Sequence, residues 1–145
     1  MQALLRQRLP FFAAALWWGS LSAIGFFAVP MLFAHLGSPA IAGSMAARLF
    51  AGQTWIAVGC GLVLLLASRP ANGDAPTGVA YGALAFVLGG LLLALLQQYG
   101  VSPRIMAREN LKLWHGVGSA MYFGQWLCAG VTLWRLQTVQ LPPAA

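Results

Sequence analysis

Carboxylates are nearly absent from this sequence, which contains only Asp74 and Glu109 among its 145 residues. A site that holds a metal through several carboxylates, or that pairs two carboxylates for hydrolysis, is therefore excluded. Charged residues of both signs make up 7% of the chain, against roughly 25% in ordinary soluble domains. The sequence also shows no nucleophile beside a base and no glycine-rich phosphate loop, so hydrolase or kinase chemistry is not expected.

Cysteine is equally scarce. Cys60 and Cys128 have no metal-type spacing and both lie in apolar runs, so we expect small buried side chains and no disulfide. The net charge of +6 comes from basic residues that are scattered and do not form one patch. We therefore expect no nucleic-acid partner, and attribute these charges to attraction by anionic lipid headgroups.

Long apolar stretches are what the sequence does have, over residues 11–33, 49–67, 79–96 and 113–133. Each is near the ~20 residues that a helix needs to cross ~30 Å of hydrocarbon. Hydrophobic residues make up 60% of the chain, and its mean hydropathy is +0.77. The sequence predicts an all-α integral membrane protein, an antiparallel four-helix bundle that occupies residues 1–145 as one domain.

Breaks between the apolar stretches are marked by proline, glycine and polar residues. Gly37-Ser38-Pro39 ends the first helix, and residues 68–76 form a polar turn. Ser102 is expected to cap a helix that begins at Pro103. Pro30 removes a backbone hydrogen bond to Phe26 and is expected to kink the first helix. That first run is too long for a secretory signal, whose apolar region has ~7–15 residues.

Small residues recur at four-residue spacing where helices can touch. Gly78 and Gly82 lie at the start of the third stretch, and a ridge in the fourth comprises Gly116, Ala120, Gly124 and Cys128. Close backbone approach at such residues is a main source of helix association in membranes. We favour packing within one chain over a seam between two copies.

Antiparallel threading would gather most polar side chains on one membrane face. That face would receive His35, Arg48, Gln97, Gln98, Tyr99, Arg104, Arg108, Glu109, Lys112 and His115. The other face would receive Arg6, Arg8, Arg69, Asp74 and Arg135. Each face has four basic residues, so the count does not decide orientation. Arg6 and Arg8 directly precede the first helix and favour a cytoplasmic N-terminus in the cell inner membrane.

Spacing within this polar cluster is informative. Arg104, Arg108 and His115 share one helical stripe. Glu109 is the only acid on this face and the only available ion-pair partner for Arg48, although Arg48 and Lys112 could equally extend to the headgroups. His115 lies inside the fourth stretch, where an ionisable side chain is either a functional group or hydrogen-bonded to a neighbouring helix.

Met31 and His35 are four residues apart and share a helical face. A thioether and an imidazole would suit Cu(I), although methionine is ordinary filler in apolar helices. Haem held by His35 and His115 would need the two histidines at similar depth on facing helices.

Taken together, these positions resemble the transmembrane protein 205-like family, a family with a domain of unknown function. Arg48-Leu49-Phe50 resembles its basic-Leu-Phe start of the second helix, and Pro103-Arg104 resembles its Pro-Arg turn. Residues 114–119, Trp-His-Gly-Val-Gly-Ser, resemble its His-Gly-x-x-Ser motif. The resemblance implies a four-helix membrane protein and supports Arg48, Arg104 and His115 as shared positions. Ala51 stands where eukaryotic relatives have proline. The layout alone is similar to copper-resistance D proteins and membrane protoporphyrinogen oxidase.

Three kinds of function fit these observations. The first is binding or transport of a small anion, metal ion or lipid headgroup by Arg48, Arg104, Arg108, Glu109 and His115. The second is a membrane redox protein that holds haem or copper through His35, His115 and Met31. The third is a scaffold whose small-residue ridges bind another copy or another membrane protein.

Overall fold

The computed structural model describes residues 2–68 and 78–140, and these residues form four continuous helices without strands. The first helix comprises α1 (Gln2–Ser22), the π-helix η1 (Ala23–Ala28) and α2 (Val29–His35). The second is α3 (Pro39–Ala67). The third comprises α4 (Gly78–Leu96), the π-helix η2 (Gln97–Val101) and α5 (Ser102–Met106). The fourth is α6 (Leu111–Gln140). The prediction of an all-helical chain is confirmed.

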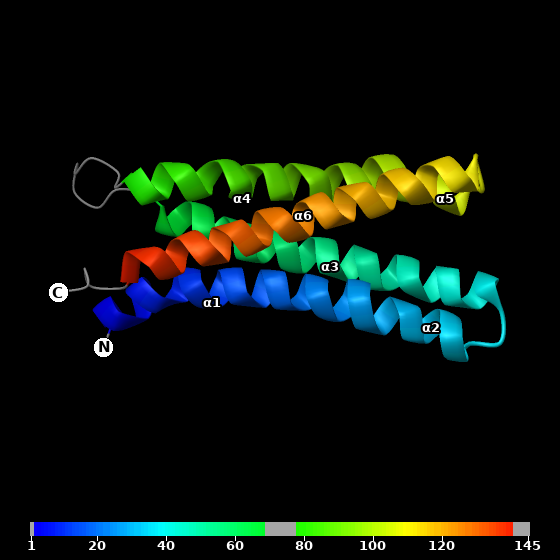
Figure 1. Ribbon diagram of the computed structural model, residues 1–145, viewed down its shortest axis with the longest axis horizontal. Helices are drawn as coiled ribbons and strands as arrows, with labels where there is room; N and C mark the ends of the chain where they lie inside the picture. The colour runs from blue at the N-terminus through cyan, green and yellow to red at the C-terminus, as the bar shows by residue number, and fades with distance from the viewer. Residues whose placement is uncertain (1, 69–77, 141–145) are drawn as a thin grey trace.

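Each helix lies against two others. α6 packs along α4 and α1, and α3 packs along α1 and α4. Figure 1 shows α2, the start of α3, α5 and the start of α6 at one end of the molecule, while α1 begins and α6 ends at the opposite end. We call the first of these the α2–α5 end. It is the end to which the predicted site residues belong.

Three helices within the described residues are long and apolar enough to cross a membrane, namely Arg8–His35, Pro39–Ala67 and Gly82–Met106. The fourth predicted stretch, residues 113–133, lies inside α6. α6 has 30 residues, but its described residues are not apolar enough for it to be counted with these three helices. Its inward face carries Tyr122, Gln125 and Thr132, which lower its mean hydropathy.

Helix boundaries follow the local sequence at one connection and depart from it at another. Ser38 caps α3 by accepting from the backbone N–H of Ile41 at 3.2 Å, with Pro39 in the first turn, as the break at Gly37-Ser38-Pro39 predicts. The predicted helix start at Pro103 is wrong, because the third helix runs through it to Met106. The predicted polar turn at residues 68–76 lies almost wholly outside the described residues.

Both π-helices end two residues before a proline. Val29, just before Pro30, donates its backbone N–H to Ile24, and Ser102, just before Pro103, donates to Gln97. Each bond spans five residues, one more than in an α-helix. A proline ring collides with the carbonyl four residues earlier, and the wider turn relieves that collision while the helix continues. Ser102 is therefore part of a helix interior and not the predicted N-cap.

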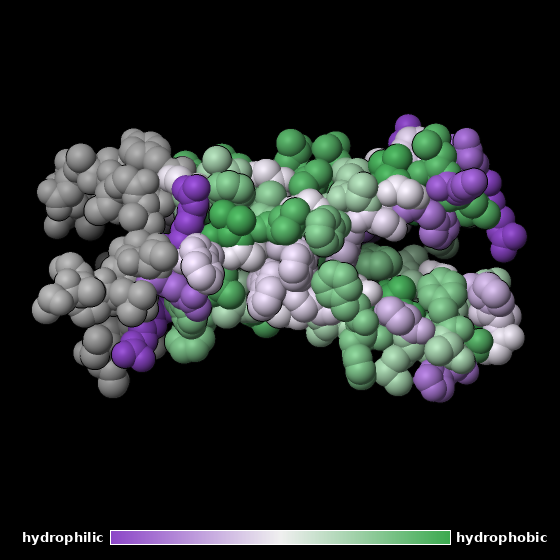
Figure 2. Space-filling view, viewed as in Figure 1, coloured by the Kyte–Doolittle hydropathy of each residue, from purple (hydrophilic) through white to green (hydrophobic). Residues whose placement is uncertain are grey.

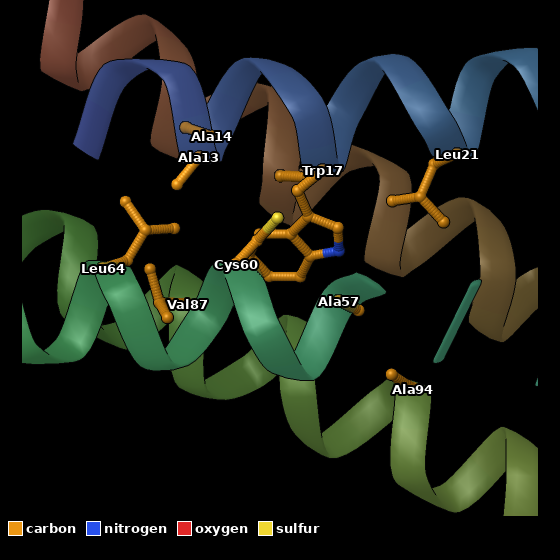
Figure 3. Packing of buried hydrophobic residues seen from close by; sticks show 10 residues of the cluster. Ala13, Ala14, Trp17, Leu21, Ala57, Cys60, Leu64, Val87 and Ala94 are labelled. Atoms are coloured by element: carbon orange, nitrogen blue, oxygen red, sulfur yellow. The ribbon is translucent and has the colours of Figure 1, made fainter. Parts of the chain in front are cut away.

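The core is built from a few large side chains among many small ones. Trp17 and Leu21 of α1 are fully buried and pack among small residues of the other helices, chiefly Ala57, Ala94 and Ala129. Figure 3 shows the Trp17 ring lying beside Cys60 between α1 and α3. Cys60 is a free, buried thiol in this core, as predicted.

Small residues of the fourth helix pack within the chain over part of their ridge. A Cβ added at Gly124 would lie 3.2 Å from Leu93 of α4, and Cys128 lies beside Gly89 and Gly90 of the same helix. At Gly116, by contrast, an added Cβ would meet nothing within 4 Å. The half of the ridge that contains Gly124 and Cys128, which we call its inner half, therefore packs against α4.

Candidate functional site

Hydrophilic side chains gather at the α2–α5 end. Figure 2 shows them over α5 and the start of α6, with a hollow separating this part of the surface from the end of α2 and the start of α3. α2 packs on α3 and makes no extensive contact with α5 or α6 within the described residues. The two halves of the molecule, α1–α3 and α4–α6, therefore diverge at this end, and polar side chains lie at the opening between them.

The turn between α5 and α6 presents the densest charge. Arg104, Arg108 and Lys112, which we call the basic rim, are all exposed, as is Glu109. No ion pair joins Glu109 to a basic side chain among the residues that the structure describes. Three cations and one carboxylate within nine residues give this turn a net positive charge.

Arg108 is held in an uncommon backbone conformation. Its φ angle is 59°, in the left-handed region, and it follows the last helical turn of α5. The N–H of Glu109 donates to the carbonyl of Arg104 at 3.0 Å, and the N–H of Arg108 donates to that of Ile105 at 3.0 Å. These two bonds define a Schellman motif, in which the left-handed position is usually glycine. An arginine there directs its side chain out of the turn at the expense of backbone strain.

Arg104 is fixed by two contacts on one side. One guanidinium nitrogen donates to the carbonyl of Gly100, and the guanidinium carbon lies 4.6 Å from the centre of the Trp114 ring. Such a cation–π contact orients the planar group between α5 and α6. The remaining guanidinium N–H groups stay available to an acceptor outside the protein.

His35 and His115 have the same local arrangement. The Nδ1 of His115 lies 2.9 Å from the carbonyl of Leu111, and that of His35 lies 3.1 Å from the carbonyl of Met31. Because a carbonyl only accepts, Nδ1 carries the proton in each neutral ring, and Nε2 presents its lone pair. Both rings are exposed. His35 is the last residue of α2, and His115 lies near the start of α6, so the two histidines belong to the two parts of the molecule that diverge at this end.

Metal binding by a larger set is not supported. No group of three or more His, Cys, Asp and Glu side chains that could hold a metal occurs within residues 2–68 and 78–140. Met31 is 44% exposed and presents its side chain at the surface near His35. The set of His35, His115 and Met31 stays a prediction.

Arg48 faces away from the other site residues. It belongs to an exposed stripe of α3 that continues through Gly52, Trp55, Gly59 and Leu62. Phe50 and Gln53 point to the opposite side of this helix, because two residues correspond to a rotation of about 200°. The expected ion pair between Arg48 and Glu109 is not formed among the described side chains. The alternative that Arg48 extends to lipid headgroups stays a prediction.

His115 is better aligned with the opening. His115, Ser119 and Tyr122 recur at four and three residues and share one face of α6. Tyr122 contacts the first half of the molecule, with its ring centre 5.2 Å from that of Phe50 in α3. His115 and Ser119 continue this face toward the α2–α5 end and are exposed because the halves diverge there.

Partly buried polar contacts between helices form a second group, which the sequence interpretation missed. Tyr122 donates to the carbonyl of Leu21 at 2.8 Å, and the Trp126 indole donates to Ser22 Oγ at 2.8 Å. Gln53 Nε2 donates to Ser20 Oγ at 3.0 Å. The signal in the sequence is Gln53, an amide side chain inside an apolar run.

Comparison with known proteins places the chain in an uncharacterised group. A family model described as a domain of unknown function, DUF4149, matches residues 12–112, which include the basic rim. No curated protein and no solved structure matches the chain. The resemblances to transmembrane protein 205-like and copper-resistance D proteins stay predictions.

Proposed function

This chain belongs to the DUF4149 family, and we propose that it is an antiparallel four-helix protein of the cell inner membrane that binds an anionic phosphate-type group at its basic rim. The observation that carries this proposal is the exposed trio of Arg104, Arg108 and Lys112 around a single carboxylate. The group bound is either a lipid headgroup or free phosphate, since both offer the same oxygens.

Two features favour a phosphate-type ligand. Arginine presents paired N–H donors that match two phosphate oxygens, and Arg104 is already oriented by Gly100 and Trp114. A basic side chain near an anionic membrane surface contributes about 1 kcal/mol. Three such side chains on one turn therefore support a preference for anionic over zwitterionic lipid, and His115 lies one helical turn further in.

The experiment compares ligands on the purified protein in detergent. We expect phosphatidylglycerol to raise the Tm and phosphatidylcholine to leave it unchanged, because a ligand that binds the folded state stabilises it. Inorganic phosphate distinguishes a free-anion site from a lipid site. Arg104→Gln and Arg108→Gly should lose the increment.

Arg48→Gln is the matched control, because Arg48 is an exposed arginine outside the opening and away from the α5–α6 turn. We expect this variant to keep the full increment. An equal loss in all three variants would show unspecific attraction to a positively charged protein and would contradict a site at the basic rim.

Orientation is part of the proposal. A cytoplasmic N-terminus would place the α2–α5 end on the outer side of the membrane. A cysteine introduced as Glu109→Cys, in a background without Cys60 and Cys128, should react with a membrane-impermeant thiol reagent in intact cells. Labelling only after lysis would show that the α2–α5 end faces the cytoplasm. That result would contradict the proposed orientation but not the proposed binding site.

A further inference from the structure

The amide of Gln53 has a defined direction in the core. Gln53 is 2% exposed, and its Nε2 donates to Ser20 Oγ at 3.0 Å. The single hydroxyl proton of Ser20 is donated to the carbonyl of Trp17 at 3.0 Å, so Ser20 can only accept from Gln53. Gln53 Oε1 is therefore turned away from Ser20. It is buried and has no hydrogen-bond partner among the described residues.

A second acceptor comes from α4 and η2. The buried residues Ala83, Val87, Gly90 and Ala94 form the inward face of α4, and Gln97 continues this face as the first residue of η2. Gln97 Oε1 is buried without a hydrogen-bond partner in the described part of the chain.

One donor completes the group. Trp17 is fully buried, and its indole Nε1, which can only donate, has no partner among the described residues. Its ring lies where an added Cβ on Gly90 would collide with it. Figure 3 shows the nitrogen edge of the ring turned toward the side on which Ala57 and Leu21 lie.

Helix geometry brings these three groups to one region of the core. Gln53 precedes Ala57 by one turn, which is about 6 Å along α3. Gln97 follows Ala94 by three residues, which is about 4.5 Å along α4. Both displacements run toward the α2–α5 end, the direction in which the Trp17 nitrogen points. α3 contacts η2, and Gln53 is bonded to α1, so all three helices meet there. Ala57 and Ala94, the neighbours of Gln53 and Gln97 along α3 and α4, are buried and carry small side chains.

We propose that Trp17, Gln53 and Gln97 form an internal binding site for a small neutral molecule that donates two hydrogen bonds and accepts one. Two amide oxygens repel an anion, and an indole N–H disfavours a cation. Water is the smallest molecule of this kind, and buried waters in proteins typically make about three hydrogen bonds. A compact amide such as urea has the same donors and acceptor. This site is separate from the basic rim and does not depend on the proposed function.

Nuclear magnetic resonance of the full chain in micelles tests the site directly. With ¹⁵N-tryptophan labelling, the Trp17 indole signal is identified by its loss in Trp17→Phe. We expect a cross-peak between this buried indole proton and water, and its loss in Gln53→Met or Gln97→Met. Saturable movement of the same signal by urea would assign the site to a small solute, whereas a water cross-peak without such movement would assign it to water.

Gln125→Met is the matched control, because Gln125 is equally buried at 3% exposed but lies on α6 and outside this group. It should leave the Trp17 signal unchanged. Absence of both the water cross-peak and any response to urea would overturn the proposal, as would persistence of the cross-peak in both variants of Gln53 and Gln97.

Thermal unfolding gives an independent readout. Groups that share a bound molecule are coupled, so the Tm decrease in the double variant Gln53→Met with Gln97→Met should be smaller than the sum of the single decreases. Gln97→Met should lower the Tm by about 4 °C, the size expected for loss of one buried hydrogen bond. Gln53→Met should lower it further, because this variant also loses the bond to Ser20. An increase of Tm in both single variants would mean that the two oxygens are simply unsatisfied, and would overturn the site.

Discussion

The hydroxyl of Tyr122 in α6 donates to the backbone carbonyl of Leu21 in α1 at 2.8 Å, at the point where α1 gives way to the π-helix η1. Gly25, within η1, provides the space for the tyrosine ring, since an added Cβ there would lie 2.5 Å from Tyr122 Cε1. One turn later along α6, Trp126 donates to Ser22 at 2.8 Å. The first and fourth helices are therefore joined by side chains beside the local widening of the first.

Removal of the Tyr122 hydroxyl should weaken this junction. Tyr122→Phe keeps the ring and its contact with Phe50 but leaves the Leu21 carbonyl without that donor. We expect a decrease of about 0.6–1.5 kcal/mol in the free energy of unfolding. Unfolding in mixed micelles measures it. Tyr99→Phe, at a residue 66% exposed, is the control and should change nothing. Equal stability of both variants would show that the hydroxyl does not contribute.

Gly25→Ala should disturb the same junction by steric overlap. The added methyl group collides with the Tyr122 ring, and overpacking of this kind destabilises by about 1–3 kcal/mol. Gly19→Ala is a matched control on the same helix, where an added Cβ meets nothing within 4 Å. That substitution should stabilise by about 0.5–1 kcal/mol through helix propensity. A lower Tm in Gly25→Ala together with a higher Tm in Gly19→Ala would show that the destabilisation comes from contact with Tyr122 and not from the added methyl group as such.

The helices were predictable from the length of the apolar runs, and their boundaries were predicted from the positions of proline. The Gly37-Ser38-Pro39 break was predictable because serine caps and proline begins helices. Pro103 follows a serine in the same way, but the prediction that a helix begins there is wrong. The wider turn of η2 accommodates this proline inside a longer helix. Whether a proline starts, kinks or is accommodated by a helix depends on what surrounds the preceding turn. Sequence spacing alone does not contain that information.

Placement of the candidate site was predictable only in part. Arg104, Arg108, Glu109 and Lys112 lie close together, in and beside the turn between α5 and α6, because they are neighbours in sequence. Arg48 was grouped with them on threading alone, which assigns a side chain to an end of a helix but not to a face. The exposed stripe of α3 that contains Arg48 becomes evident only from packing. The pairing of Gln53 with Ser20 likewise depends on contact between distant segments.

Gly124→Leu should separate packing within the chain from packing against a partner. Gly124 lies against Leu93 of α4, so a larger side chain should destabilise the protein by about 1–3 kcal/mol. Gly116→Leu changes the same ridge at a position with open space around it and should be tolerated. Thermal unfolding and size-exclusion chromatography report the two effects. Loss of a larger assembly in Gly116→Leu, with unchanged Tm, would instead assign the outer half of the ridge to a second copy.

Arg108→Gly should raise stability while it removes a charge from the basic rim. Arginine with φ at 59° is strained, and glycine adopts this conformation without a Cβ clash. We expect a gain of about 1 kcal/mol in unfolding free energy, measured by Tm in detergent. Arg108→Ala removes the same charge but keeps the strain, so it should show no such gain.

Arg104→Gly introduces glycine into helical α5 and should lower stability by about 0.5–1 kcal/mol. Loss of the phosphatidylglycerol effect in both Arg108 variants, although only Arg108→Gly relieves the backbone strain, would assign that effect to the guanidinium. If Arg108→Ala kept the lipid effect, the arginine would be present only as part of the turn.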